Sequence, residues 1–197
     1  PSTVGGALVN IAIPLIGKIP VNLNFTASAD AFNSSIAQCD IKTVITARPF
    51  AEKIAAKCPV PADAVYIEDL LEGISHGAKI KALLKALFYP ISMLYPSRHI
   101  SSDDPATIIF SSGSTGDPKG IMLSHHNILS NIDAFDMVLR FGKADRVCGV
   151  LPFFHSFGFT VTLWAPLVTG VQVCYHPNPI EGAVIADLVR DNQLTLL

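Results

Sequence analysis

The sequence predicts an α/β fold in which mainly parallel strands are flanked by helices. Short apolar runs bounded by turn residues alternate with segments of helical periodicity, the order typical of such a sheet. Hydrophobic residues make up 50% of the 197 residues and charged residues only 15%, so the chain can build a core and is too apolar to stay disordered. The formal net charge of −2 argues against a nucleic-acid partner, which would require a basic excess.

The first third of the chain predicts three helices and three short strands. Small and apolar residues dominate the first helix, and Pro14 falls near its end. Ser28 or Asp30 is placed to cap the second helix. The strands carry β-branched and apolar residues, as in "KTVITA" and "AVYI". The helices are expected at 3–16, 28–38 and 49–57, and the strands at 20–23, 42–47 and 64–67.

Residues 74–94 have a helical period that allows two interpretations. The ordinary one is a helix that turns its apolar face to the core and its lysines to solvent. The alternative is a basic amphipathic helix that lies on a membrane surface. Pro90 should kink or end this helix. The apolar positions, at steps of three and four, are Ile74, Ile80, Leu83, Leu84, Leu87, Phe88 and Ile91, and the lysines between them are Lys79, Lys81 and Lys85.

A polar segment, "SRHISSDDP" at 97–105, predicts a linker between two portions of one domain, 1–96 and 106–197. In the second portion, Ser124 is placed to cap a helix that runs through "HHNILSNIDAFDMVL". The other expected elements are strands at 106–110, 146–151 and 171–175, a strand or turn at 120–123, and a helix or buried run at 159–168.

One uncharged segment is long enough to span a bilayer. Residues 147–180 contain no Asp, Glu, Lys or Arg. Four prolines, three glycines and two histidines interrupt the segment, so it predicts buried core elements and not a spanning helix.

The four cysteines fit a reducing compartment. They form no C-x-x-C pair, and their scatter supports neither a zinc site nor a disulfide framework. We therefore expect a cytoplasmic protein, which a membrane-surface helix at 74–94 would bring to the inner face of the cell membrane. The cysteines are Cys39, Cys58, Cys148 and Cys174.

The segment "SSGSTGDPKG" at 111–120 predicts a polyphosphate-binding loop. Its glycines let backbone N–H groups approach an anion, its hydroxyl groups are further donors, and Lys119 adds a positive charge. The segment is not a Walker P-loop, because Pro118 stands where G-x-x-x-x-G-K-[ST] requires glycine. The alternative is a surface loop that is merely rich in small residues. The candidate ligands are Ser111, Ser112, Gly113, Ser114, Thr115, Gly116 and Lys119.

Two motifs carry a resemblance to a known family. "TIIFSSGSTGDPKGIMLSHHNI" meets every position of [ST]-S-G-[ST]-[ST]-G-x-P-K-G, and "LPFFHSFGF" at 151–159 agrees with L-P-x-[FY]-H-x-x-G. The chain thus resembles the adenylate-forming (AMP-binding) superfamily over essentially its whole length, as a partial N-terminal domain. "PSTVGGALVNIAIPLIGKIPVNLNF" and "DIKTVITAR" are most similar to bacterial acyl-CoA and acyl–acyl-carrier-protein synthetases, including those fused to 2-acylglycerophosphoethanolamine acyltransferases.

The resemblance implies an ATP-dependent fatty acid ligase. In this family a carboxylate attacks the α-phosphate of Mg²⁺–ATP, and a thiol of CoA or of carrier-protein phosphopantetheine then takes the acyl group. By similarity, residues 111–119 hold the β- and γ-phosphates, and Lys119 screens charge on the leaving pyrophosphate. His155 matches the motif histidine near the carboxylate and the α-phosphate, and is the candidate catalytic residue. A hydrogen-bonded core histidine is the alternative.

Other residues have more ordinary explanations. Adjacent histidines point in different directions on a helix, so His125 and His126 predict a helix start and no metal site. The phenylalanines of the second motif suit either an acyl-chain wall or core packing. They are Phe153, Phe154, Phe157 and Phe159.

Further motifs of the family, for adenine, Mg²⁺ and ribose, are absent from these residues, so we expect the chain alone to be inactive. Two other functions remain open: an adenylating ligase for an aromatic or amino acid, and a non-catalytic nucleotide-binding or membrane-surface module.

Overall fold

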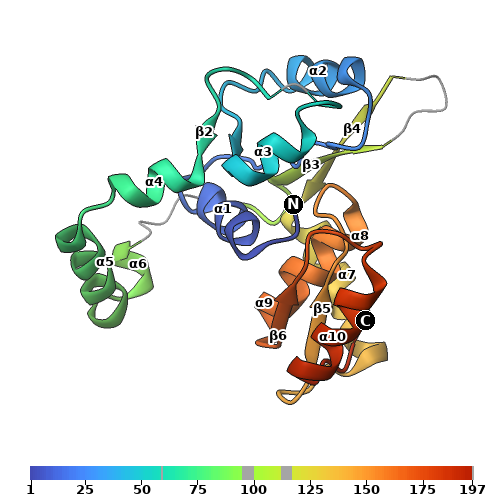
Figure 1. Cartoon of the computed structure of the whole chain (residues 1–197). Helices are drawn as coiled ribbons and strands as arrows, with labels where there is room; N and C mark the ends of the chain where they lie inside the picture. The colour runs from blue at the N-terminus through green and yellow to red at the C-terminus, as the bar shows by residue number, and fades with distance from the viewer. Residues whose placement is uncertain (59, 95–99, 112–116, 197) are drawn as a thin grey trace.

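The computed structural model describes residues 1–58, 60–94, 100–111 and 117–196. Short helices alternate with short strands along the chain (Figure 1). In order they are α1 (Val4–Leu15), α2 (Ala29–Gln38), β1 (Ile45–Thr46), α3 (Arg48–Ile54), β2 (Val65–Tyr66), α4 (Ile67–Gly73), α5 (His76–Phe88), α6 (Ile91–Leu94), β3 (Pro105–Ser111), β4 (Lys119–Ser124), α7 (His125–Leu139), β5 (Arg146–Gly149), α8 (Ser156–Gly158), the π-helix η1 (Phe159–Trp164), α9 (Ala165–Thr169), β6 (Gln172–Tyr175) and α10 (Gly182–Asn192).

The described strands form three two-stranded sheets. β1 pairs with β2 and β5 pairs with β6, both in parallel, whereas β3 and β4 form an antiparallel hairpin. A single parallel bridge places Val21 beside Ile108, and another places Leu196 beside Val147. The chain therefore has the predicted α/β fold, with parallel pairing everywhere except in the hairpin.

The strand expected at 20–23 is reduced to that one bridge at Val21. Pro20 has no N–H to offer a ladder. Its carbonyl instead accepts a hydrogen bond from Thr107 Oγ1 at 2.8 Å, and the Thr107 side chain is fully buried. The segment is thus fixed to β3 by a side chain more than by backbone pairing.

Serine caps begin two helices where the sequence predicts them. Ser28 Oγ accepts a hydrogen bond from the N–H of Ala31 at the start of α2. Ser124 and Asn127 form a capping box at the start of α7, in which each side chain accepts from the other residue's backbone N–H, at 3.2 and 3.0 Å. These bonds satisfy donors that the first helical turn leaves unpaired.

The predicted linker falls partly on residues 95–99, which lie outside the described residues. Its end contacts α7. The carbonyls of Ser102 and Asp104 accept hydrogen bonds from the N–H groups of His126 and His125, at 2.8 and 3.2 Å. The two histidines are therefore the helix-starting residues that the sequence predicts.

The core lies where α1, β3, α7 and η1 meet. Phe159 and Leu163 of η1 and Ile132 of α7 are almost inaccessible to solvent. Tyr175 Oη donates to the carbonyl of Thr162 at 2.9 Å, which ties β6 to η1. These buried residues come from α1, from β3 and α7, and from the uncharged segment 147–180, so apolar segments far apart in sequence share one core.

The uncharged segment 147–180 is confirmed as a set of core elements, since it contains most of β5 and all of α8, η1, α9 and β6, and its Phe153, Phe159 and Leu163 are buried. Within the described part of the chain, no helix is long and apolar enough to cross a membrane. All four cysteines are free; Cys58 and Cys148 are buried, and Cys39 and Cys174 are half-buried. Burial raises the pKa of the Cys58 and Cys148 thiols, which keeps them in the unreactive thiol form.

Residues 67–94, which we call the arm, differ from the ordinary interpretation. Pro90 separates α5 from α6 as predicted, but α5 contains no buried residue. In Figure 1, α4 leads away from the body of the molecule to α5 and α6. A core-facing helix at 74–94 is therefore wrong for this chain, because α4 carries the segment away from the core before its apolar face can pack there.

Candidate functional site

The predicted phosphate loop connects the two strands of the β3–β4 hairpin. Its first residue, Ser111, ends β3, and Lys119 begins β4; the two stand opposite each other in the ladder. The antiparallel register fixes where the loop leaves and re-enters the sheet. Five of the predicted ligands lie outside the described residues: Ser112, Gly113, Ser114, Thr115 and Gly116.

Two contacts hold the end of the loop, where the chain enters β4. Gly120 lies under the Phe110 ring, and a Cβ at position 120 would meet two of that ring's carbons at 3.2 and 3.3 Å. Gln38 of α2 donates from Nε2 to the carbonyl of Pro118 at 2.9 Å. The side chain of Lys119 is exposed and forms no ion pair with a described residue, so its charge is available to an anion.

His155 lies in the loop that follows β5. Its backbone closes a turn, with its N–H donating to the carbonyl of Pro152 at 3.1 Å, and its carbonyl accepts from the N–H of Phe159 at 2.8 Å as the helical stretch begins. The imidazole is exposed and lies beside the Phe154 ring, with centroids 4.5 Å apart. The buried-histidine alternative therefore does not describe His155, whose ring is open to a ligand.

The phenylalanines of the second motif divide into two groups. Phe153, Phe154 and Phe159 are buried, at 2%, 4% and 0% exposure, and pack against other rings. Phe157 alone of the four is exposed, where its ring meets Phe135 at 5.7 Å. Three of the four rings are thus core residues, and they do not form an open wall for an acyl chain.

The structure brings Ser111 and Lys119 together but records no hydrogen bond or ring contact between either of them and His155. The described residues also contain no group of three His, Cys, Asp or Glu side chains that could hold a metal ion. By their chemistry Ser111 and Lys119 suit an anionic ligand, whereas the described residues supply no cage for Mg²⁺.

A polar cluster in the loop after β6 was not predicted. Because Gly149 and Tyr175 are paired at the ends of parallel strands, the loops after β5 and β6 leave the same sheet edge. In the second loop, His176 Nε2 lies 2.8 Å from Glu181 Oε2, and Asn178 donates to Glu181 Oε1 at 2.7 Å. These bonds, the one from Asn178 first, lower the pKa of Glu181. The signal that could have found the cluster was "HPNP" directly after a parallel strand.

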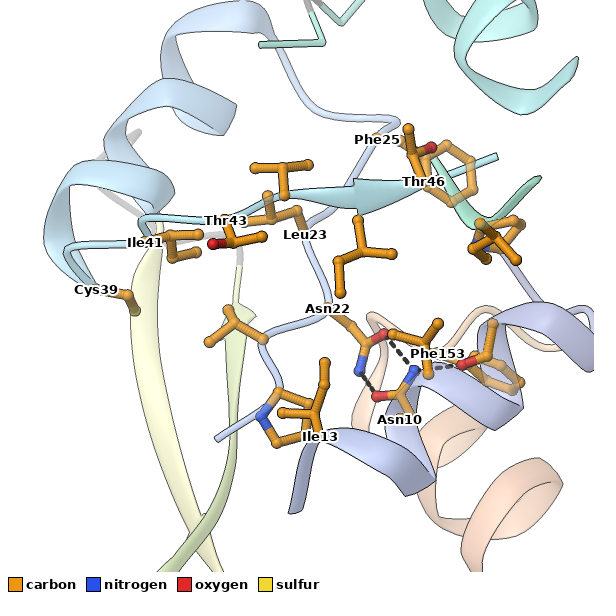
Figure 2. Close-up of a pocket in the computed structure, with 18 of the residues that line it drawn as sticks. Asn10, Ile13, Asn22, Leu23, Phe25, Cys39, Ile41, Thr43, Thr46 and Phe153 are labelled. Carbon is orange, nitrogen blue, oxygen red and sulfur yellow. Dashed lines mark hydrogen bonds between the residues drawn. The ribbon is translucent and has the colours of Figure 1, made fainter. Parts of the chain in front are cut away.

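A large pocket lies elsewhere, between α1, residues 20–25 and β1 (Figure 2). Its volume is about 730 Å³ and its lining is mainly apolar. Asn10 and Asn22 bond to each other inside it through both amides, at 3.1 and 2.8 Å. Ser111, Lys119 and His155 are not part of its lining. Because the residues predicted to bind ATP or to act in catalysis lie outside this pocket, we assign the candidate site to the hairpin loop and His155.

Comparison with known proteins agrees with the two motifs. The family model "AMP-binding enzyme" matches residues 3–197. The 4-chlorobenzoate–CoA ligase of Arthrobacter sp is 31% identical over 163 residues, which are 80% of this chain and 28% of that protein. Acyl-CoA ligase SID4 of Ajellomyces capsulatus is 33% identical over 124 residues, 62% of this chain and 21% of that protein. The chain thus spans about a quarter of the length of these curated relatives.

Solved structures show the same fold. The O-succinylbenzoate coenzyme A synthetase of Bacillus subtilis, in complex with ATP and magnesium ion, is similar with a TM-score of 0.72 at 18% identity, over 99% of this chain and 47% of that one. A putative long-chain-fatty-acid CoA ligase from Rhodopseudomonas palustris has a TM-score of 0.73 at 18% identity, over 98% and 47%. With a family model that covers nearly every residue, this chain belongs to the AMP-binding enzyme family.

Proposed function

We propose that this chain is the polyphosphate-holding part of an ATP-dependent acid–thiol ligase. The observation that carries the proposal is the register of the β3–β4 hairpin. Its pairing of Ser111 with Lys119 holds both ends of a segment rich in donors, and Lys119 makes no ion pair with a described residue. Family membership over residues 3–197 supports a nucleoside triphosphate as the ligand of that loop.

The proposed reaction has two steps. A carboxylate oxygen attacks the α-phosphorus of ATP, the bond to the bridging oxygen breaks, and pyrophosphate leaves with the electron pair, which gives an acyl-adenylate. A thiol sulfur then attacks the acyl carbon, loses its proton and displaces AMP. Negative charge grows on the β- and γ-phosphates in the first step, where the loop donors and Lys119 stabilise it. His155, exposed beside Phe154, is proposed to orient the carboxylate or the α-phosphate.

For the acid we propose a fatty acid, activated for transfer to CoA or to an acyl-carrier protein. The apolar second half supports a fatty acid only weakly, because three of its motif phenylalanines are core residues. An aromatic acid is the second candidate, since relatives named for 4-chlorobenzoate and 4-coumarate are 31% and 27% identical to this chain. The names of these relatives favour CoA as the acceptor over a carrier protein. The cytoplasm is the proposed compartment, which four free cysteines support.

The test is acid-dependent exchange of pyrophosphate into ATP by the longest native polypeptide that contains this chain. Long-chain fatty, aromatic and amino acids should be compared, with Mg²⁺ present. Lys119→Ala should lower kcat about 100- to 1000-fold, the range for removing one donor to transition-state charge. Lys143→Ala is the matched control, because Lys143 is also exposed and lies outside both motifs.

Exchange that is unaffected by Lys119→Ala would contradict the assigned role of the loop. ATP binding without exchange for any acid would favour a non-catalytic nucleotide-binding module. Residues 1–197 on their own are expected to show no exchange, because the chain spans 47% or less of the relatives and structures described above.

A further inference from the structure

Helix α5 exposes an apolar face that no described element buries. The exposed fractions are 59% for Ile80, 58% for Leu83 and 66% for Leu87, and Phe88 reaches 76%. Near the end of the arm, α6 exposes Met93 at 64%. Isolated exposed leucines are ordinary, but a contiguous apolar set on one helix marks a contact surface.

The apolar side chains of α5 share one side of the helix. At 100° per residue, Leu83, Leu87, Ile80, Leu84 and Phe88 fall in that order within an arc of about 140°. Lys79 borders one edge of this arc, and Lys81 and Lys85 lie beyond the other edge. The opposite side carries only small residues, Ala78, Ala82 and Ala86. Long lysine stems can lie along an apolar surface while their ammonium groups stay in water.

The charge around this face has a single sign. No Asp or Glu occurs between Gly73 and Ser102, and Lys79, Lys81 and Lys85 make no ion pair with a described residue. A leucine- and phenylalanine-rich face bordered by lysines is the pattern of helices that lie in the interface of an anionic bilayer. An acidic protein partner would need the lysines but not five large apolar side chains.

The base of the arm is held to the body. The Arg48 guanidinium donates to both carboxylate oxygens of Asp69 at 2.6 Å and lies 4.4 Å from the centroid of the Tyr66 ring. The Arg48 N–H also donates to Glu68 at 3.2 Å. α4 is therefore fixed where it leaves β2, and α5 stands beyond it, away from the core (Figure 1).

We propose that α5, with α6 beside it, docks the protein on an anionic lipid surface. The helix lies in the plane of the interface, with the apolar arc centred on Ile80 turned toward the acyl chains and the three lysines at the level of the headgroups. Docking requires neither ATP nor the ligase reaction, so it stands or fails separately from the proposed function.

The experiment is flotation of the longest native polypeptide containing this chain with vesicles of phosphatidylcholine, with and without about one third phosphatidylglycerol. Binding should require the anionic lipid and weaken as salt shortens the screening length. Replacing Lys79, Lys81 and Lys85 by Gln should lower the partition coefficient about fivefold per lysine. The Leu83→Gln/Leu87→Gln double variant should lower it at least tenfold, because two buried leucines are lost.

The matched control is the Ala82→Gln/Ala86→Gln double variant on the opposite side of α5, which should bind vesicles like the unaltered protein. Equal loss in both double variants, or no loss in the leucine variant, overturns the proposal. So does a fall of several degrees in the Tm of the leucine variant, which would show that protein covers this face. Salt-sensitive binding to an acidic carrier protein, without binding to vesicles, would contradict the proposal and identify that protein as the partner of this face.

Discussion

Two regions of this molecule are rich in apolar residues and fold in opposite ways. In the segment 147–180, Phe159 is fully buried and Leu163 is 2% exposed; in the arm, Phe88 is 76% exposed and Leu83 is 58% exposed. The buried segment has no charged residue at all, whereas α5 places lysines at both borders of its apolar face. Apolar periodicity therefore identifies a face, while the charges around it indicate whether protein or another phase covers that face.

Two phenylalanines, Phe159 in the core and Phe88 in the arm, should differ most in their contribution to stability. Phe159→Ala should lower the free energy of unfolding by about 3–5 kcal/mol, since it leaves a cavity in the core. Phe88→Ala should change it by no more than about 0.5 kcal/mol. Urea denaturation of both variants measures the difference. A large loss for Phe88→Ala would mean that the arm packs against protein after all.

Two glycines give a second pair. A Cβ at Gly158 would lie 2.3 Å from the carbonyl oxygen of Pro152, so Gly158→Ala should destabilise the body by about 1–3 kcal/mol through overpacking. A Cβ at Gly77 meets nothing within 4 Å, and Gly77→Ala should stabilise α5 by up to about 1 kcal/mol. The Tm reports the first change, and slower amide exchange in α5 reports the second. An unchanged Tm for Gly158→Ala would show that the turn at Pro152 can shift to accommodate the added methyl group.

Capping serines give a third pair with a smaller effect. Ser124→Ala removes half of the capping box of α7 and should cost about 1 kcal/mol of global stability. Ser75 Oγ accepts from the N–H of Ala78 at 3.2 Å, and Ser75→Ala should cost a similar amount in α5 alone. Amide exchange separates the two cases: the first variant should raise exchange throughout the core, and the second only in 76–88. Equal global losses would contradict the separate behaviour of the arm.

The smallest effect is expected at alkaline pH. Burial raises the pKa of Tyr175 to about 12. Because the folded-state pKa lies above the unfolded one, this stability is present below pH 10 and is lost as the pH rises toward 12. The half-buried ring is partly screened, so we expect a loss below about 1 kcal/mol. Tyr175→Phe should reduce the fall in the free energy of unfolding between pH 10 and 12. An unchanged fall would mean that other ionisable groups cause it.

Local chemistry predicted much of the fold. Ser124 and the helix behind it, Pro90 as a break, and the uncharged segment as core all follow from patterns within a few residues. The environment of α5 could not be predicted, because the helical period is the same whether protein, lipid or water covers the face. The π-conformation of η1 was also not predictable from the sequence: it accompanies long-range packing, such as the bond from Tyr175 to the Thr162 carbonyl.

The candidate site divides in the same way. The two motifs predicted the hairpin loop and His155 as candidate site residues, because each motif consists of residues that are consecutive in the sequence. The cluster of His176, Asn178 and Glu181 was missed. Only the register of β5 with β6 shows that its loop and the loop containing His155 start at the same edge of the sheet. A pattern within one segment can indicate its chemistry, whereas the residues that become neighbours across a sheet can be identified only from the fold.

The attachment of residues 20–25 has a consequence for synthesis of the chain. Pro20 is bound by Thr107, and the Phe25 ring packs at 5.0 Å against Phe154. These partners leave the ribosome about 90 to 130 residues later, roughly ten seconds at ordinary elongation rates. During that interval the apolar helix α1 has no finished core to join. A nascent chain stalled before residue 107 should therefore be protease-sensitive in its first 25 residues and prone to capture by chaperones.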